Sequence, residues 1–146
     1  MKPALTFRQP VPPNSWHDIP CGKLIATQIE QRLESWWPRM FGYFFLKIGA
    51  LSSAIDCSNS LIKNQISLGN GSNDCDVTGD IDELPFVEHG VDICLLSQCL
   101  EFSIDPHHVM REANRVLIPN GYLIITGFNP LSLAGFNKLI PYRRSQ

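Results

Sequence analysis

The stretch that decides the fold runs from Val91 to Pro130 and reads VDICLLSQCLEFSIDPHHVMREANRVLIPNGYLIITGFNP. Its first part, Val91–Leu96, is an almost continuous apolar run, as expected of a parallel strand that is covered on both faces. Asp105-Pro106 then favours a helix start, because Asp caps free N–H groups and Pro suits the first helical position. Pro119-Asn120-Gly121 has turn chemistry, and Tyr122–Thr126 is a second apolar strand. The stretch therefore predicts a strand–helix–strand crossover with parallel strands.

The bulk composition fits one globular domain. The chain has 146 residues, 44% of them hydrophobic, and a formal net charge of -2, which gives no basic surface for nucleic acid. Its five cysteines are odd in number and have no paired spacing, as expected of reduced thiols in the cytoplasm. No run reaches the roughly 18 apolar residues of a membrane helix. We therefore expect a cytoplasmic protein without a membrane segment.

Several residues of this stretch also carry a family resemblance. Val91–Glu101, Asp105-Pro106 and Arg111–Leu117, with Leu84-Pro85-Phe86 upstream, resemble the second half of class I S-adenosylmethionine-dependent methyltransferases of the type 11 kind. The resemblance is strong over Asp80–Pro130 and weak before it. It implies a Rossmann-like, doubly wound α/β fold with a mainly parallel sheet in the order 3-2-1-4-5. It also implies S-adenosylmethionine as the cofactor.

The expected elements follow from periodicity and from this resemblance. Strands are expected near Phe44–Ile48, Gln65–Leu68, Cys75–Thr78, Val91–Leu96 and Tyr122–Thr126. A helix is expected at Asp105–Leu117, and the apolar stripe of Lys23–Trp37 predicts an amphipathic helix before Pro38.

The expected domain organisation has three parts. Residues 1–22 form a Pro-rich arm with Trp16 as its anchor, and residues 23–130 form the methyltransferase-like domain. Residues 131–146 are expected to form a short helix and tail, without the last two strands that the family has. That would leave Tyr122–Thr126 as an exposed edge strand, through which the chain could self-associate.

The resemblance assigns cofactor binding to Gly49, Asp80, Ile81, Ser97 and Gln98, each of which follows a strand. It implies that Asp80 accepts a hydrogen bond from the adenine amino group, with Ile81 against the ring. It also implies that the Ser97-Gln98 loop holds the methionine portion. These residues should meet at the carboxyl ends of the strands.

The sequence departs from the family pattern around the first two strands. Lys47 stands where a carboxylate is expected, while Leu51 and Ser53 stand where further glycines are expected. Leu51 could obstruct the cofactor. Leu68-Gly69-Asn70 also lacks the acidic residue that would bind the ribose hydroxyls.

No catalytic residue can be demanded from the sequence, because the cofactor supplies the electrophile and the protein supplies mostly positioning. Cys99 could be a nucleophile, or a metal ligand with Cys94, His107 and His108, but neither arrangement has a recognised spacing. Glu101 is the most plausible polar group facing the cleft, although a surface pair with an Arg would explain it equally well. We predict no metal site.

Three functions compete at this point. The first is methyl transfer to an unidentified acceptor, expected to be a small molecule. The second is a catalytically inactive methyltransferase-like domain that serves in protein interaction. The lost glycines, the missing carboxylate for the ribose hydroxyls and the missing C-terminal strands favour it. The third is a nicotinamide dinucleotide domain, which would need a fuller glycine fingerprint and an acidic residue about 20 residues later.

Overall fold

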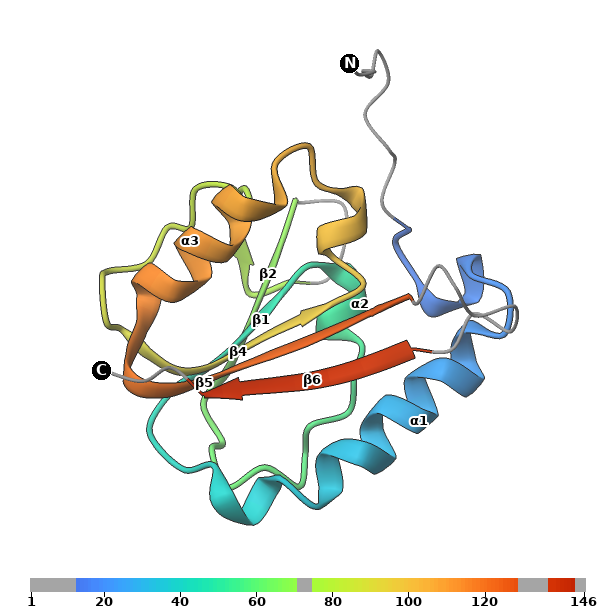
Figure 1. The fold of residues 1–146 in the computed structure, drawn as a ribbon, viewed down its shortest axis with the longest axis horizontal. Coiled ribbons are helices and arrows are strands. Elements are labelled where there is room, and N and C mark those ends of the chain that lie inside the picture. Colours follow the sequence, from blue (N-terminus) through green and yellow to red (C-terminus); the bar gives the residue numbers. More distant parts are fainter. Residues whose placement is uncertain (1–12, 71–74, 129–136, 144–146) are drawn as a thin grey trace.

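One six-stranded sheet organises the protein (Figure 1). The computed structural model describes residues 13–70, 75–128 and 137–143. The strands lie in the order β3-β2-β1-β4-β5-β6, and the first five are parallel to one another. The predicted order 3-2-1-4-5 is therefore confirmed.

The elements have the following bounds. The strands are β1 (Phe45–Ile48), β2 (Gln65–Gly69), β3 (Val77–Thr78), β4 (Val91–Ser97), β5 (Leu117–Phe128) and β6 (Asn137–Arg143). The α-helices are α1 (Gly22–Glu34), α2 (Ala50–Ser53) and α3 (Pro106–Val116). Short 3₁₀ helices occupy Trp16–Asp18, Trp37–Arg39 and Leu100–Phe102.

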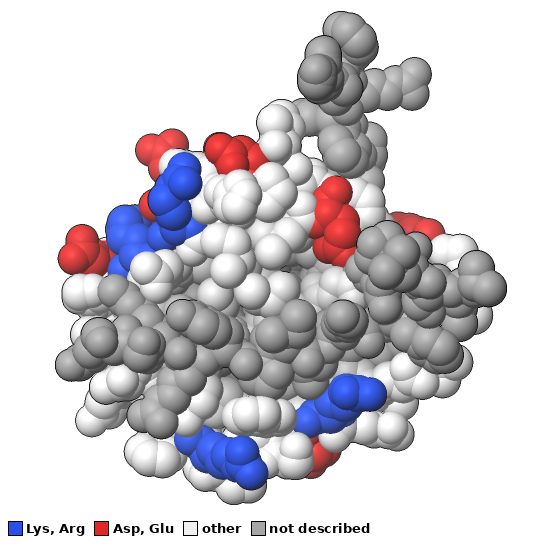
Figure 2. Space-filling model, in the orientation of Figure 1, with Lys and Arg blue, Asp and Glu red and all other residues white. Residues whose placement is uncertain are grey.

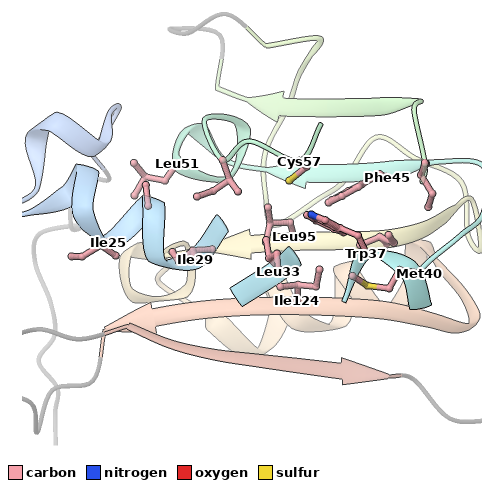
Figure 3. Packing of buried hydrophobic residues seen from close by; sticks show 14 of the residues in the cluster. Ile25, Ile29, Leu33, Trp37, Met40, Phe45, Leu51, Cys57, Leu95 and Ile124 are labelled. Atoms are coloured by element: carbon pink, nitrogen blue, oxygen red, sulfur yellow. The ribbon is translucent and has the colours of Figure 1, made fainter. Parts of the chain in front are cut away.

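Each face of the sheet has its own hydrophobic core, because side chains alternate along a strand. One core packs Ile29 and Leu33 of α1 against Phe45, Leu95 and Ile124 of the sheet (Figure 3). The other core packs α3 against the opposite face, through its buried residues Val109, Ala113 and Val116. Figure 1 shows α1 and α3 on opposite sides of the sheet, as a doubly wound fold requires.

The crossover from β4 through α3 to β5 forms as predicted. The Asp105 side chain accepts a hydrogen bond from the His108 N–H at 3.2 Å, and Pro106 is the first helical residue. β4 is buried over its whole length, including Asp92. The Asp92 carboxylate accepts the N–H groups of Tyr43 and Phe44 at 2.8 and 3.0 Å. The polar side chain of Asp92, in an otherwise apolar strand, is thus paired with backbone donors of the segment that precedes β1.

Two predicted boundaries differ from the structure by three residues or more. Helix α1 ends at Glu34, three residues before Trp37, and a separate 3₁₀ turn carries Trp37 into the core. β5 begins at Leu117 rather than Tyr122. Pro119-Asn120-Gly121 forms an irregularity within the strand, because Leu117 already pairs with Val91 and the register shifts before Ile93 pairs with Tyr122.

The prediction for the C-terminal part is wrong where the structure describes it. Residues 137–143 form the strand β6, antiparallel to β5, and not a helix. Residues 129–136 lie outside the described residues. β6 pairs with Tyr122–Phe128, so Tyr122–Thr126 is not an exposed edge. The apolar residues from Leu131 to Ile140 fit a helix stripe, but the unpaired side of β5 offers backbone partners that stabilise a strand instead.

Among the helices of the described ranges, none has the length and apolar character needed to cross a lipid bilayer.

Candidate cofactor site

A cavity of about 360 Å³ lies at the carboxyl ends of the parallel strands. This volume is within the range of about 300–1,000 Å³ that is usual for small-molecule sites. It is lined by Pro13, Asn14, Gly49, Ala50, Leu51, Gly69, Asn70, Gly79, Asp80, Ile81, Asp82, Ser97, Gln98, Cys99, Phe102, Ser103 and Ile104. All five residues expected to bind the cofactor therefore lie around one cavity.

Sheet topology explains why these residues meet. β1 lies between β2 and β4, so the chain leaves β1 and β4 toward opposite edges of the sheet. Ligands of open α/β sheets bind at such a switch point, beside the carboxyl ends of the strands. Asp80 and Asp82 follow β3 on one side of β1, while Ser97 ends β4 on the other side and Gln98 follows it. The cavity therefore runs across the ends of β2, β1 and β4.

Gly49 forms the turn between β1 and α2 and needs to be glycine. Its φ is +93°, a left-handed value that side chains disfavour. Its N–H donates to Leu68 O at 2.8 Å, and its carbonyl accepts the Ser53 hydroxyl at 2.8 Å. A Cβ added there would have only Cys99 Sγ, at 3.6 Å, within 4 Å. The backbone at Gly49 is thus open to close approach by a ligand.

The residues at the replaced positions around this turn make contacts within the fold, and Leu51 also lines the cavity. The Lys47 ammonium donates to Ile55 O at 3.0 Å, so it holds the segment after α2. Leu51 is only 3% exposed and belongs to the core that also contains Trp16. The Trp16 indole N–H donates to Leu51 O at 3.0 Å, so Trp16 is held against the core. Leu51 therefore supports the turn from the core side.

The β2–β3 side of the cavity carries an amide and two carboxylates. Asn70 directly follows β2, where the resemblance implied an acidic residue. Asp80 and Asp82 are exposed, and the Asp80 carbonyl accepts the Glu83 N–H at 3.3 Å. Ile81 is partly buried and packs against the core around β2 and β4. Within the described lining, Asp80 and Asp82 are the charged residues, so this wall favours donors and cations.

A buried polar network lies at the β4 end of the cavity. The Thr126 hydroxyl lies 2.9 Å from Ser97 Oγ and 2.7 Å from Gln98 Oε1. The Ser97 N–H donates to Ser52 Oγ in α2 at 2.7 Å. Ser52 and Thr126 were not anticipated, because single hydroxyls in buried segments produce no periodic signal in a sequence.

Cys99 lines the cavity but is a poor nucleophile. Burial, and then the nearby charges of Glu101 and Asp82, raise the pKa of its thiol to about 12. A thiol with such a pKa is almost fully protonated at neutral pH, and the thiolate is the reactive form. No group of three or more His, Cys, Asp or Glu residues in the described parts of the chain is arranged to hold a metal ion.

The mouth of the cavity was only partly predicted. Phe102, Ser103 and Ile104 reach it from the segment after β4, and Ile104 is 69% exposed. Pro13 and Asn14 reach it from the N-terminal arm. Glu101 is not among the lining residues, since its carboxylate lies beside Gly127, where an added Cβ would be 3.1 Å from Glu101 Oε2.

Charge on the surface is mixed. On the face drawn in Figure 2, the Lys and Arg side chains of the described residues lie in separate groups. Acidic side chains stand near them and along the upper rim of the same view. This face therefore has no single continuous patch of one sign among its described residues.

Comparison with known proteins points to one family. The model of the family described as "Methyltransferase domain" matches residues 40–125. The uncharacterized protein YafS of Escherichia coli K12 is 42% identical over 144 residues, which are 99% of this chain and 60% of YafS. The chain thus spans about three fifths of that relative's length.

Solved structures share the fold at low identity. An S-adenosylmethionine-dependent methyltransferase of Thermotoga maritima, described as a possible histamine N-methyltransferase, aligns with a TM-score of 0.61 and 20% identity. The alignment covers 77% of this chain and 56% of that one. A similar methyltransferase of Archaeoglobus fulgidus aligns with a TM-score of 0.57 and 19% identity, over 75% and 56% of the two chains.

Proposed function

Because this chain belongs to the methyltransferase-domain family, which matches residues 40–125, we propose that its cavity binds S-adenosylmethionine for methyl transfer to a small-molecule acceptor. The observation that carries the proposal is the cavity itself. It gathers the ends of β1, β2 and β4 and the segment after β3 at the switch point of the sheet.

The residues present fit such a cofactor. The open backbone at Gly49 allows a ligand to approach the turn after β1 closely. Asp80 offers a carboxylate acceptor for an adenine amino group, and Ile81 offers an apolar surface beside it. At the other end, Ser97 and Gln98 supply polar groups for the methionine portion. Asn70 stands where the family has the acidic residue that binds the ribose hydroxyls. Its amide can both donate and accept hydrogen bonds.

The bound cofactor would supply an electrophilic methyl group on a sulfonium. The chain's own residues then orient the reactants and exclude water, which lowers the barrier without an obligatory catalytic side chain. The raised pKa of Cys99 argues against covalent catalysis by this thiol. Catalytic residues therefore remain unassigned. The exposed Ile104 at the mouth lies where an acceptor would enter.

A second candidate is a catalytically inactive domain that mediates protein interaction. The features that favour it are Lys47, engaged with Ile55 O, and Asn70, which lacks a carboxylate charge. A neutral amide would bind ribose hydroxyls more weakly than a carboxylate does. A domain that had lost catalysis would retain the same sheet and core.

Calorimetric titration of the chain with S-adenosylhomocysteine and, separately, with NAD tests the proposal. We expect saturable binding of one S-adenosylhomocysteine per chain and no heat of binding with NAD. If neither ligand binds, the result favours the catalytically inactive interaction domain. Binding of NAD alone would indicate a nicotinamide dinucleotide site.

The proposed compartment is the cytoplasm. All five cysteines are free, which suits a reducing environment. Activity toward an acceptor, and the acceptor itself, are proposals for the whole protein, since the chain spans 60% of the length of YafS.

A further inference from the structure

We infer that Thr126, which does not line the cavity, is a positioning residue that holds Gln98 in the conformation that forms the cavity wall. The inference concerns two residues of this chain and their mutual contacts. The test by ligand binding rests on the proposed function, whereas the test by hydrogen–deuterium exchange does not.

Gln98 has a backbone conformation that needs support. Its φ is +47°, in the left-handed region that a residue with a side chain disfavours. The other described non-glycine residues with positive φ are Cys21, His89 and Asn120, and none of these lines the cavity. Such strained residues persist where the surrounding structure fixes them, and they cluster at ligand sites.

Thr126 fixes Gln98 through two contacts. The Gln98 N–H donates to the Thr126 carbonyl at 2.8 Å, a contact that any residue at position 126 could make. The Thr126 hydroxyl lies 2.7 Å from Gln98 Oε1, and only a hydroxyl-bearing side chain of this size makes that contact. Both residues are nearly inaccessible, with Thr126 1% and Gln98 2% exposed. Water therefore cannot replace the hydroxyl without a rearrangement.

The chemistry of the groups sets the direction of the hydrogen bonds. An amide oxygen only accepts, so the Thr126 hydroxyl donates to Gln98 Oε1. A hydroxyl has one proton, so the Ser97 hydroxyl, 2.9 Å away, donates in turn to Thr126 Oγ1. This arrangement turns the amide oxygen of Gln98 toward β5.

The same network reaches the turn at Gly49. Ser97 donates its N–H to Ser52 Oγ, and Ser52 lies in the short helix that Gly49 precedes. Thr126 thus lies at one end of a buried chain of contacts that joins β5, the end of β4 and α2. Its neighbours Ile124 and Ile125 belong to the two cores, one on each face of the sheet, so a Val at 126 would suit the strand equally well. The hydroxyl is the feature that packing alone does not require.

The experiment compares Thr126→Val, which keeps the shape and removes the hydroxyl, with Thr126→Ser, which keeps the hydroxyl. The matched control is Ser60→Ala, because Ser60 is also buried (0% exposed) and its hydroxyl accepts the Ile62 N–H away from the cavity. Each variant is measured by calorimetric titration with S-adenosylhomocysteine and by hydrogen–deuterium exchange of residues 97–104. We expect Thr126→Val to weaken binding about tenfold or more, as the loss of a buried hydrogen bond predicts, and to speed exchange in 97–104. Thr126→Ser should bind S-adenosylhomocysteine with a dissociation constant within about threefold of that of the unaltered chain. Ser60→Ala should change neither the dissociation constant nor the exchange in 97–104.

The inference is overturned if Thr126→Val exchanges in 97–104 as the unaltered chain does, or if its affinity is unchanged while the unaltered chain binds. If the unaltered chain binds no S-adenosylhomocysteine, the proposed function fails, and the exchange comparison still decides the role of Thr126. If Thr126→Val does not fold, Thr126→Ala removes the same hydroxyl and is measured in the same way. Thr126→Ala should bind about tenfold more weakly than the unaltered chain, and unchanged binding by it overturns the inference.

Discussion

In the proposed cofactor site, Asp80 is the residue whose charged side chain would recognise one chemical group, the adenine amino group. It is exposed in the free protein and lies beside Asp82, so its carboxylate is available to a ligand. The Gly49 turn contributes backbone rather than side-chain atoms, and the space where a Gly49 side chain would lie is open to a ligand. Under the proposed function, recognition of the cofactor would depend on one carboxylate at the β3 side and on Ser97 and Gln98 at the β4 side.

Replacement of Asp80 by Ala should weaken S-adenosylhomocysteine binding by about 1.5–3 kcal/mol, the value of a hydrogen bond to a charged group. Calorimetric titration measures this, with Glu83→Ala as the control, since Glu83 is exposed but does not line the cavity. An unchanged dissociation constant for Asp80→Ala would mean that Asp80 is a solvated loop residue.

Cys99 should react slowly with iodoacetamide although it lines the cavity. Its pKa of about 12 leaves roughly one thiolate in ten thousand at pH 8, and the reactive fraction grows tenfold with each pH unit up to that pKa. Cys21, which is exposed, serves as the internal comparison. Mass spectrometry after timed alkylation should find Cys21 modified first. Equal rates at the two cysteines would show that Cys99 is activated.

At the scale of elements, α3 does more than cover the sheet. Glu112 and Arg115 lie one turn apart on it and form a bidentate pair with distances of 2.9 and 3.0 Å. Glu112 accepts the Leu84 N–H, and Arg115 donates to the carbonyls of Leu84 and Phe86. The helix thereby holds the segment that follows Asp80 and Asp82.

Glu112→Gln should lower stability at neutral pH by about 1 kcal/mol, since the pair is partly exposed. The hydrogen bond from Arg115 lowers the pKa of Glu112 below its usual 4.5. A lowered folded-state pKa stabilises the protein above the unfolded value and loses that contribution as pH falls through the folded value. The stability difference from the unaltered protein should therefore shrink below about pH 4.5.

Urea unfolding at pH 7 and at pH 3 measures this difference, with Glu88→Gln as an exposed control. A difference that is the same at both pH values would mean that the charge of Glu112 contributes nothing to the fold.

The elements also show what local sequence can and cannot predict. β4 and α3 were predictable because their signals are local: a continuous apolar run, and a cap followed by Pro. The start of β5 was not, since Asn120 and Gly121 have turn chemistry and only the pairing of Leu117 with Val91 extends the strand past them. β6 was missed for the same reason, because its partner determines its conformation.

The position of the cavity was predictable because the strand order determines which strand ends meet. Once strand order is known, Gly49, Asp80 and Ser97 must lie near one another at the carboxyl edge. The left-handed conformation of Gln98 and its contact with Thr126 depend on side-chain geometry, which no spacing in the sequence reveals.

At the scale of the whole molecule, the two end strands of the sheet, β3 and β6, differ in length. β3 has only two residues, while β6 has seven and pairs with β5 over Tyr122–Phe128. The sequence of β6 includes Lys138, Pro141 and Arg143. Charged residues and proline on an end strand discourage pairing with another chain. The presence of β6 thus removes the exposed edge on which self-association through residues 122–126 was predicted.

A chain that ends at Phe128 should associate, whereas the 146-residue chain should remain monomeric. Removal of β6 exposes the backbone N–H and C=O groups of Tyr122–Phe128 along one side of β5. That stretch contains Leu123-Ile124-Ile125, which is β-prone and carries no charge, so it is a template for pairing between chains. Size-exclusion chromatography with light scattering over a concentration series compares the two chains. Association of both would mean that β6 does not protect the edge, and a monomeric truncated chain would mean that β5 alone does not drive pairing.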